Sequence, residues 1–201
     1  MGVPQAEGEP ESPTFGPTAL VTPANLVTVA RIAASPVFIS MIVSWGARWS
    51  TFATGFAIAM TDYLDGWLAR RHGKTRAGAF LDPLADKVLV LGGLAALVWN
   101  GQFHAAPVII IAARELLISA YRSRAGRKGI TVPATQLAKW KTFTQLWAIG
   151  FAVMPPLATH VHWLATLTLW IAVALTIWTG WAYLRSARSV AAAQLGEEPA
   201  S

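Results

Sequence analysis

Six long apolar stretches, separated by short polar segments, make up most of this 201-residue sequence. Each is close to the roughly 17–25 residues that a helix needs to cross a bilayer. They cover residues 24–45, 50–69, 78–99, 105–121, 137–154 and 161–184. Because a segment in lipid must satisfy its own backbone hydrogen bonds, each is predicted to be an α-helix. The pattern predicts an all-α, polytopic membrane protein with six transmembrane helices.

Both ends of the chain are polar. Residues 1–17 contain Pro, Gly and Glu but neither the basic nor the apolar region of a signal peptide, so a disordered tail is expected. Residues 18–190 are predicted to form one six-helix membrane domain, and residues 191–201 a polar C-terminal tail.

Composition agrees with this class. The chain is 54% hydrophobic and 13% charged, which is typical of a membrane protein. Its net charge of +6 comes from short clusters of Lys and Arg between apolar stretches, which favours anionic lipid headgroups and gives no reason to expect a nucleic-acid partner. The absence of cysteine excludes disulfides and thiol catalysis.

Basic residues gather in alternate connections between the apolar stretches. By the positive-inside rule these connections, and with them both termini, are predicted to lie on the cytoplasmic side. The basic groups are Arg70, Arg71, Lys74 and Arg76; then Arg122, Arg124, Arg127 and Lys128; then Arg185 and Arg188.

Acidic residues are scarce, and most fall in one segment. Between Ser12 and Gly196 the chain has five, namely Asp62, Asp65, Asp82, Asp86 and Glu115. The first two are spaced i, i+3 and the next two i, i+4, so each pair shares a helix face. The turn at residues 71–77 can fold the two helices into an antiparallel hairpin. Both pairs are then expected to meet near the cytoplasmic interface.

Four neighbouring carboxylates repel one another unless protons or cations intervene. Ligation by oxygen alone suits Mg²⁺ or Mn²⁺, and two such ions about 4 Å apart could clamp a phosphoryl displacement. Gly66, Ala69 and Gly78 would let a nucleotide or diphosphate approach the backbone, and Arg70 offers donors for phosphate. The alternative is that these aspartates cap helices or pair with the Arg cluster. That alternative leaves the spacing of all four aspartates unexplained.

A second group of charged residues could form a cationic pocket for a phosphate group. They are Arg114, Arg122, Lys139 and Lys141, with Arg31 as a further candidate. Two alternatives stay open: Arg114 pairs with Glu115 inside the bundle, or the two lysines extend to the interface.

The segment from Asp62 to Asp86 resembles the signature of the CDP-alcohol phosphotransferase family. Every fixed position matches: two Asp, then Gly66 and Ala69-Arg70, then Gly78 and two more Asp. The gap between Arg70 and Gly78 is shorter than usual, and it falls in the turn. Residues 23–145 are also similar to the phosphatidylglycerophosphate synthase branch, at Pro23, Asn25, Thr28, Arg31, Pro36, Phe80, Pro83, Lys87, Arg114, Glu115, Lys139, Lys141, Thr142 and Gln145.

The resemblance implies a homodimer in the bacterial inner (cytoplasmic) membrane, with two divalent metals in a polar cavity open to the cytoplasm. It implies that Asp62, Asp65 and Asp82 bind the metals, and that Asp86 lies beside them and is the catalytic base. The residues implied to contact the cytidine diphosphate are Asp65, Gly66, Ala69, Arg70, Gly78 and Asp82.

These observations together predict a membrane transferase domain with its active site on the cytoplasmic side. The reaction that the resemblance implies moves the phosphatidyl group from CDP-diacylglycerol to sn-glycerol 3-phosphate and releases CMP, and the cationic pocket is then expected to bind the phosphate of this acceptor. Two alternatives remain: the same chemistry with phosphatidylglycerol or an inositol phosphate as acceptor, and a divalent-cation transporter that uses the Asp cluster as its ion site.

Overall fold

The computed structural model describes residues 22–72, 76–127 and 136–195. This part of the chain contains seven α-helices and no strand. Six of them coincide with the predicted stretches: α1 (Pro23–Trp45), α2 (Trp49–His72), α3 (Arg76–Trp99), α4 (Ala105–Arg127), α5 (Gln136–Val153) and α7 (His162–Leu195). The all-α prediction is confirmed.

Three details differ from the expected pattern. A short helix, α6 (Pro155–His160), occupies a connection with no predicted helix, because two prolines at its first positions have the backbone angle that starts a helix. Two other helices run past their apolar stretches, α4 to Arg127 and α7 to Leu195. Arg and Lys are good helix formers, so a change in polarity need not end a helix.

The ends of α1 are defined by local chemistry. Thr22 precedes the helix, and its Oγ1 accepts a hydrogen bond of 3.2 Å from the backbone N–H of Asn25. Pro23 at the first helical position needs no hydrogen-bond partner for its nitrogen. Gly46 closes the helix with φ +61°, a conformation that favours glycine, and its N–H donates to the carbonyl of Ile42.

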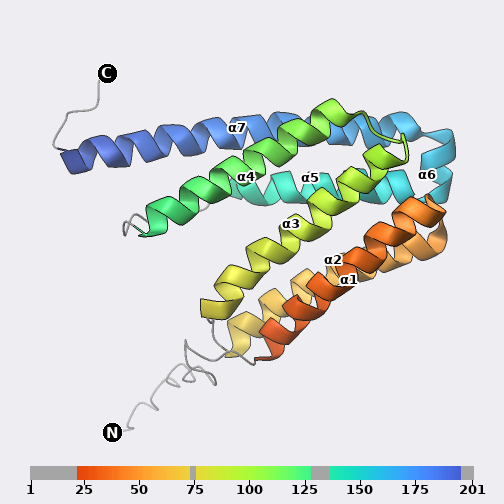
Figure 1. The fold of residues 1–201 in the computed structure, drawn as a ribbon, viewed down its shortest axis with the longest axis horizontal. Helices are drawn as coiled ribbons and strands as arrows, with labels where there is room; N and C mark the ends of the chain where they lie inside the picture. The colour runs from red at the N-terminus through yellow and green to blue at the C-terminus, as the bar shows by residue number, and fades with distance from the viewer. Residues whose placement is uncertain (1–21, 73–75, 128–135, 196–201) are drawn as a thin grey trace, which may run out of the picture.

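The helices form two groups (Figure 1). In the first, α1 packs against both α2 and α3, and α2 and α3 run in opposite directions. The predicted meeting of the two Asp pairs lies outside the described residues, because the side chains of Asp62 and Asp65 belong to the undescribed part. In the second, α5 and α4 pack along α7. Contacts of α3 with α4 and α5, and of α2 with α5, join the groups.

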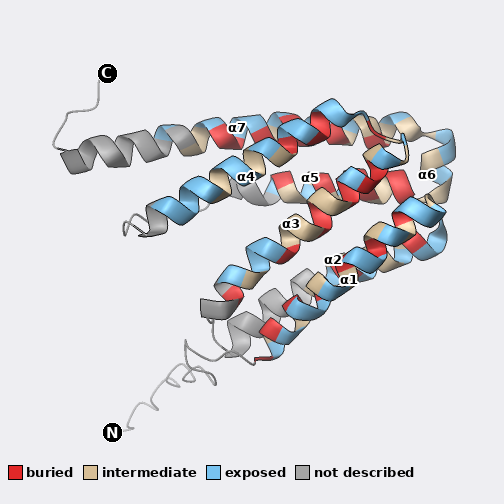
Figure 2. Ribbon diagram, viewed as in Figure 1, coloured by how far each residue is buried: buried red, intermediate tan, exposed pale blue. Residues whose placement is uncertain are grey.

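The apolar core lies where the two groups meet. Its fully buried members include Ile42, Leu94, Leu97, Ile111 and Leu169, from α1, α3, α4 and α7. Figure 2 shows buried positions along the inner sides of these helices and exposed ones outside. Packing of this core holds α3 against α4 and α5, which positions the polar end of α3 described below.

The outer surface is strongly apolar. Its exposed side chains include Trp99, Leu117, Trp178 and Trp181, all more than 65% exposed. Among the described residues, α1 and the segment His162–Tyr183 of α7 are long and apolar enough to cross a membrane. Such a surface suits lipid better than water.

Candidate active site

Two carboxylates of α3, Asp82 and Asp86, lie one helical turn apart on the wall of a cavity of about 270 Å³. The cavity is bounded by α3, α4, α5 and α7. Asp82 is exposed, and the side chain of Asp86 keeps 45% of its surface accessible. A ligand in the cavity can therefore reach both carboxylates.

Helix α1 supports these carboxylates from behind. The hydroxyl of Thr28 lies 2.9 Å from Oδ1 of Asp82. The guanidinium of Arg31 forms an ion pair with Asp86, with 3.5 Å between Nη1 and Oδ1, and its Nε donates to Oγ1 of Thr61 on α2 at 3.2 Å. These contacts tie α1 to both other helices of its group.

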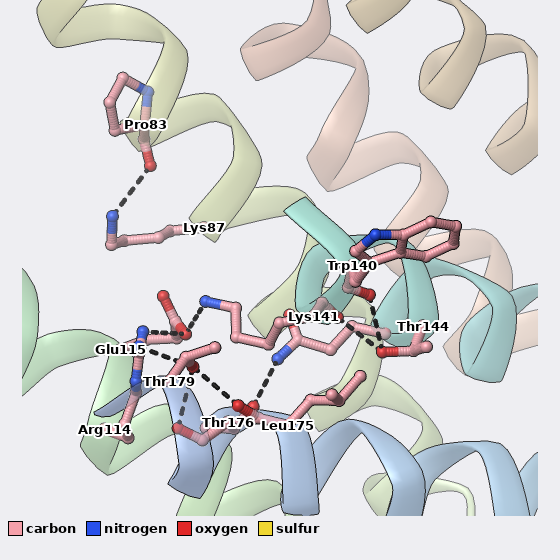
Figure 3. A network of polar contacts seen from close by, with 11 residues as sticks. Pro83, Lys87, Arg114, Glu115, Trp140, Lys141, Thr144, Leu175, Thr176 and Thr179 are labelled. Atoms are coloured by element: carbon pink, nitrogen blue, oxygen red, sulfur yellow. Dashed lines mark hydrogen bonds and ion pairs between the residues drawn. The ribbon is translucent and has the colours of Figure 1, made fainter. Parts of the chain in front are cut away.

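The opposite wall of the cavity is built around Glu115 on α4 (Figure 3). Its Oε1 accepts a hydrogen bond from the ammonium of Lys141 on α5 and another, of 3.2 Å, from Nη1 of Arg114. Lys141 is only 5% exposed, and burial of an unpaired ammonium would be costly. The shared carboxylate makes the burial of two cations tolerable.

Further hydrogen bonds connect this wall to α7. Nη2 of Arg114 donates to Oγ1 of Thr179 at 2.9 Å, and the Thr179 hydroxyl donates to the carbonyl of Leu175 at 2.7 Å. Nε2 of Gln145 donates to Oγ1 of Thr176 at 3.3 Å. The wall is therefore a connected polar network across three helices, in which the donors have limited freedom to move.

Two more cations border the same cavity. Arg122 lies two turns beyond Arg114 on α4, and Lys87 follows Asp86 on α3. Nζ of Lys87 donates to the carbonyl of Pro83 at 3.2 Å. The cavity thus has carboxylates on one side and mainly cations on the other. The cationic side suits the phosphate of a ligand, and the carboxylate side suits a group of the same ligand that needs a base or a bound cation.

The structure brings five of the sequence-predicted site residues to one cavity: Asp82, Asp86, Arg114, Arg122 and Lys141. Arg31 lies apart from the other acceptor candidates, on α1 behind Asp86. Gly78 is buried in the first turn of α3. The pairing of Arg114 with Glu115, one of the roles that the sequence leaves open, is present in the cavity wall.

Other predicted site residues have side chains outside the described part of the structure. They are Asp62, Asp65, Gly66, Ala69 and Arg70 on α2, and Lys139 on α5. The α2 backbone places Asp62 directly after Thr61, the residue that Arg31 contacts.

Sequence reasoning missed the role of several threonines. Thr28 and Thr61 contact site residues, and Thr176 and Thr179 belong to the cavity network. The spacing of Thr176 and Thr179, i and i+3 in an otherwise apolar stretch, was a usable signal, because polar residues on one face of a spanning helix usually face a partner.

The carboxylate oxygens of Asp82 and Asp86 suit a hard cation. Within the described ranges, no three His, Cys, Asp or Glu side chains come together as a group that could hold a metal ion. Asp82 and Asp86 form an oxygen pair at i, i+4, and two carboxylates with ligand oxygens are a common way to bind Mg²⁺. The described residues that line this cavity include no histidine, and His104 and His162 line a separate cavity.

Comparisons with known proteins agree on one family. The profile described as CDP-alcohol phosphatidyltransferase matches residues 21–178. The chain is 35% identical over 170 residues to a CDP-diacylglycerol–glycerol-3-phosphate 3-phosphatidyltransferase of Rickettsia bellii, covering 82% of this chain and 94% of the relative. It is 36% identical over 173 residues to a probable phosphatidylglycerophosphate synthase of Mycobacterium tuberculosis, covering 82% of this chain and 80% of the relative. A Pseudomonas fluorescens protein with the same name as the Rickettsia one is 37% identical over 173 residues, covering 81% and 88%.

Proposed function

Because this chain belongs to the CDP-alcohol phosphatidyltransferase family, we propose that its cavity transfers the phosphatidyl group of CDP-diacylglycerol to sn-glycerol 3-phosphate. The products are phosphatidylglycerophosphate and CMP. Membership of the family makes the chain an enzyme, a transferase of phospholipid biosynthesis. The named relatives support these substrates.

One observation carries the proposal: Asp82 and Asp86 share a cavity with Arg114, Arg122 and Lys141. An acceptor that carries its own phosphate needs cations, and its hydroxyl needs a base at the other end. The cavity offers both within about 270 Å³, a volume that suits a small phosphorylated alcohol. An uncharged acceptor would leave the cationic wall without a ligand.

In the proposed reaction, Lys141, Arg114 and Arg122 hold the phosphate of the acceptor. Asp86 receives the proton of the acceptor hydroxyl while the oxygen of that hydroxyl bonds to the phosphorus of the phosphatidyl group. The bond from that phosphorus to CMP breaks, and CMP leaves with the electron pair. Orientation by the connected network around Glu115 supplies much of the rate, because a fixed acceptor reacts more readily than a mobile one.

Members of the family generally use divalent metals, and the residues proposed to hold two ions, Mg²⁺ or Mn²⁺, are Asp62, Asp65, Asp82 and Asp86. When bound, these ions neutralise the diphosphate and stabilise the leaving CMP. The residues proposed to contact the cytidine diphosphate are Asp65, Gly66, Ala69, Arg70, Gly78 and Asp82. The other acceptor candidate on α5, Lys139, lies two residues before Lys141.

We also propose that residues 18–190 form a single domain whose six long helices cross the bacterial inner membrane, with both termini cytoplasmic, and that it forms a homodimer. Trp residues support a membrane boundary at one end of the helices. Trp45, Trp49, Trp99 and Trp163 are exposed at the helix ends opposite the Asp82 end of α3. Indoles prefer the membrane interface, so these residues fit the far, periplasmic boundary.

The test is CMP release by the purified protein in detergent micelles with CDP-diacylglycerol and Mg²⁺, with and without glycerol 3-phosphate. Release that requires the acceptor, and stops in EDTA, is the expected result. Release only with phosphatidylglycerol or an inositol phosphate would replace the acceptor and keep the chemistry. Metal uptake into vesicles without CMP release would replace the whole proposal with transport.

A further inference from the structure

Helix α1 has a line of buried polar residues that faces α2 and α3. Asn25, Thr28, Arg31 and Ser35 recur at helical spacing, and each is at most 4% exposed. The rest of α1 is apolar enough for a membrane span. Polar groups inside such a helix are costly and are rare without a structural or functional reason.

Arg31 has the clearest reason. Its side chain is fully buried, yet a guanidinium remains charged at any relevant pH. The buried charge is compensated by Asp86 on α3 and by the hydroxyl of Thr61 on α2. Removing either Arg31 or Asp86 would leave the other charge without this partner.

Thr28 makes a comparable contact with the other carboxylate. Its Oγ1 lies 2.9 Å from Oδ1 of Asp82 and 3.1 Å from the carbonyl of Ala24, one turn earlier. A hydroxyl has one hydrogen, and both of these neighbours are acceptors. The contact with Asp82 thus limits the rotation of the carboxylate that lines the cavity.

We propose that Thr28 and Arg31 are positioning residues that fix Asp82 and Asp86 from the side away from the cavity. Arg31 in this role is a permanent counter-ion for the Asp cluster and not a ligand for the acceptor. It offsets repulsion among the carboxylates whenever their cations are absent. This inference rests on the proposed function for the role of the carboxylates, and its test below does not depend on turnover.

The first experiment measures Mn²⁺ binding to the detergent-purified full chain by electron paramagnetic resonance, without substrates. Thr28→Val removes the hydroxyl at nearly constant shape, and we expect Mn²⁺ affinity to fall about tenfold, with Thr28→Ser restoring it. Ser35→Ala is the matched control, because the Ser35 hydroxyl bonds to the carbonyl of Arg31 within α1. Unchanged affinity in Thr28→Val, absence of Mn²⁺ binding by the wild type, or an equal loss in Ser35→Ala would overturn the role of Thr28.

The second experiment compares the unfolding temperature in EDTA and in Mn²⁺. Arg31→Met should lower it more in EDTA than in Mn²⁺, because the added cation replaces the lost positive charge. Arg31→Lys keeps the charge and should show a smaller difference between the two conditions. An equal decrease in both conditions would mean that Arg31 only packs α1 against its neighbours.

Kinetics separate this inference from the proposed function. In the CMP-release assay, Arg31→Met should lower kcat at least tenfold and leave the KM for glycerol 3-phosphate nearly unchanged. A raised KM with unchanged kcat would make Arg31 an acceptor ligand. If the wild type binds Mn²⁺ but releases no CMP, the proposed function fails, and the binding and unfolding results still decide the positioning roles.

Discussion

Glu115 and Lys141 are 26 positions apart in the chain, and the ammonium of Lys141 donates directly to Oε1 of Glu115. This contact joins α4 to α5 inside the cavity wall. Because Arg114 donates to the same oxygen, one carboxylate orders two cations. The contact therefore contributes both to the stability of the bundle and to the geometry of the proposed acceptor site.

Glu115→Ala is expected to destabilise the protein by about 3 kcal/mol, because it leaves the buried ammonium of Lys141 without its partner. Chemical unfolding in detergent micelles measures this change. The double variant Glu115→Ala/Lys141→Met should recover much of the loss, because it also removes the unpaired charge. A double variant that is as unstable as the sum of the two single variants would show that the residues are not coupled.

Arg122→Gln is expected to raise the KM for glycerol 3-phosphate about tenfold and to change kcat little, because a charge-assisted hydrogen bond to phosphate is lost. Arg124→Gln is the matched control, since Arg124 is exposed on the same helix and is not among the residues that line the cavity. Steady-state CMP release at varied acceptor concentration gives both constants. Equal effects in the two variants would point to general surface charge instead of a binding contact.

Asp86→Asn is expected to lower kcat by about 10²–10⁴-fold while CDP-diacylglycerol still binds, because an amide does not accept the hydroxyl proton. Asp82→Asn should weaken nucleotide binding as well as turnover. Equilibrium binding of CDP-diacylglycerol to each purified variant separates the two roles. Equal loss of binding in both variants would make Asp86 mainly a ligand.

Gly180 on α7 lies under the side chain of Arg114. A methyl group at this position would lie 3.3 Å from Nε and 3.4 Å from Cγ of Arg114, so Gly180→Ala should displace the guanidinium and raise the KM for the acceptor several-fold. Gly150→Ala is the control, because the nearest atom to its new methyl group, in Phe52, is 4.0 Å away. A rise in KM in both variants would show that the effect of Gly180→Ala does not act through Arg114.

Gly55→Ala is expected to destabilise the packing of α1 on α2 by about 1–3 kcal/mol, because overpacking of a buried contact costs about this much. The added methyl group would lie 2.6 Å from Cε2 of Phe38, a ring that is only 2% exposed. The double variant Gly55→Ala/Phe38→Leu should regain part of the loss. Thermal unfolding of the three variants measures the effect, and an unchanged single variant would show that the ring moves aside freely.

The sequence predicted the six long helices of the described residues well, because long apolar stretches between polar segments favour helices. It predicted α1 to within one residue at each end, but it missed α6, which depends on Pro155 and Pro156 and not on hydropathy. It also missed the continuation of α7 to Leu195.

The site was predictable where spacing alone decides it. An i, i+4 pair such as Asp82 and Asp86 must share a face of α3. Contacts between helices depend on packing that spacing does not specify, so the pairing of Arg31 with Asp86 and of Lys141 with Glu115 became visible only in the structure. The roles of the four aspartates as metal ligands and of Arg114, Arg122, Lys139 and Lys141 as acceptor ligands stay predictions.

The position of α1 between the two other helices of its group has a consequence for biogenesis. In the proposed membrane topology, α1 is synthesised before α2 and α3, so Arg31 enters the membrane before Thr61 and Asp86 exist. An arginine at the centre of a span raises the free energy of insertion by about 2.5–3.5 kcal/mol. Arg31 is off the centre of α1 and adds a smaller cost, which lasts until its partners arrive. Assembly of α1 with α2 and α3 should therefore follow closely on synthesis of α3, and truncation before Asp86 should make the nascent chain a substrate for membrane quality control.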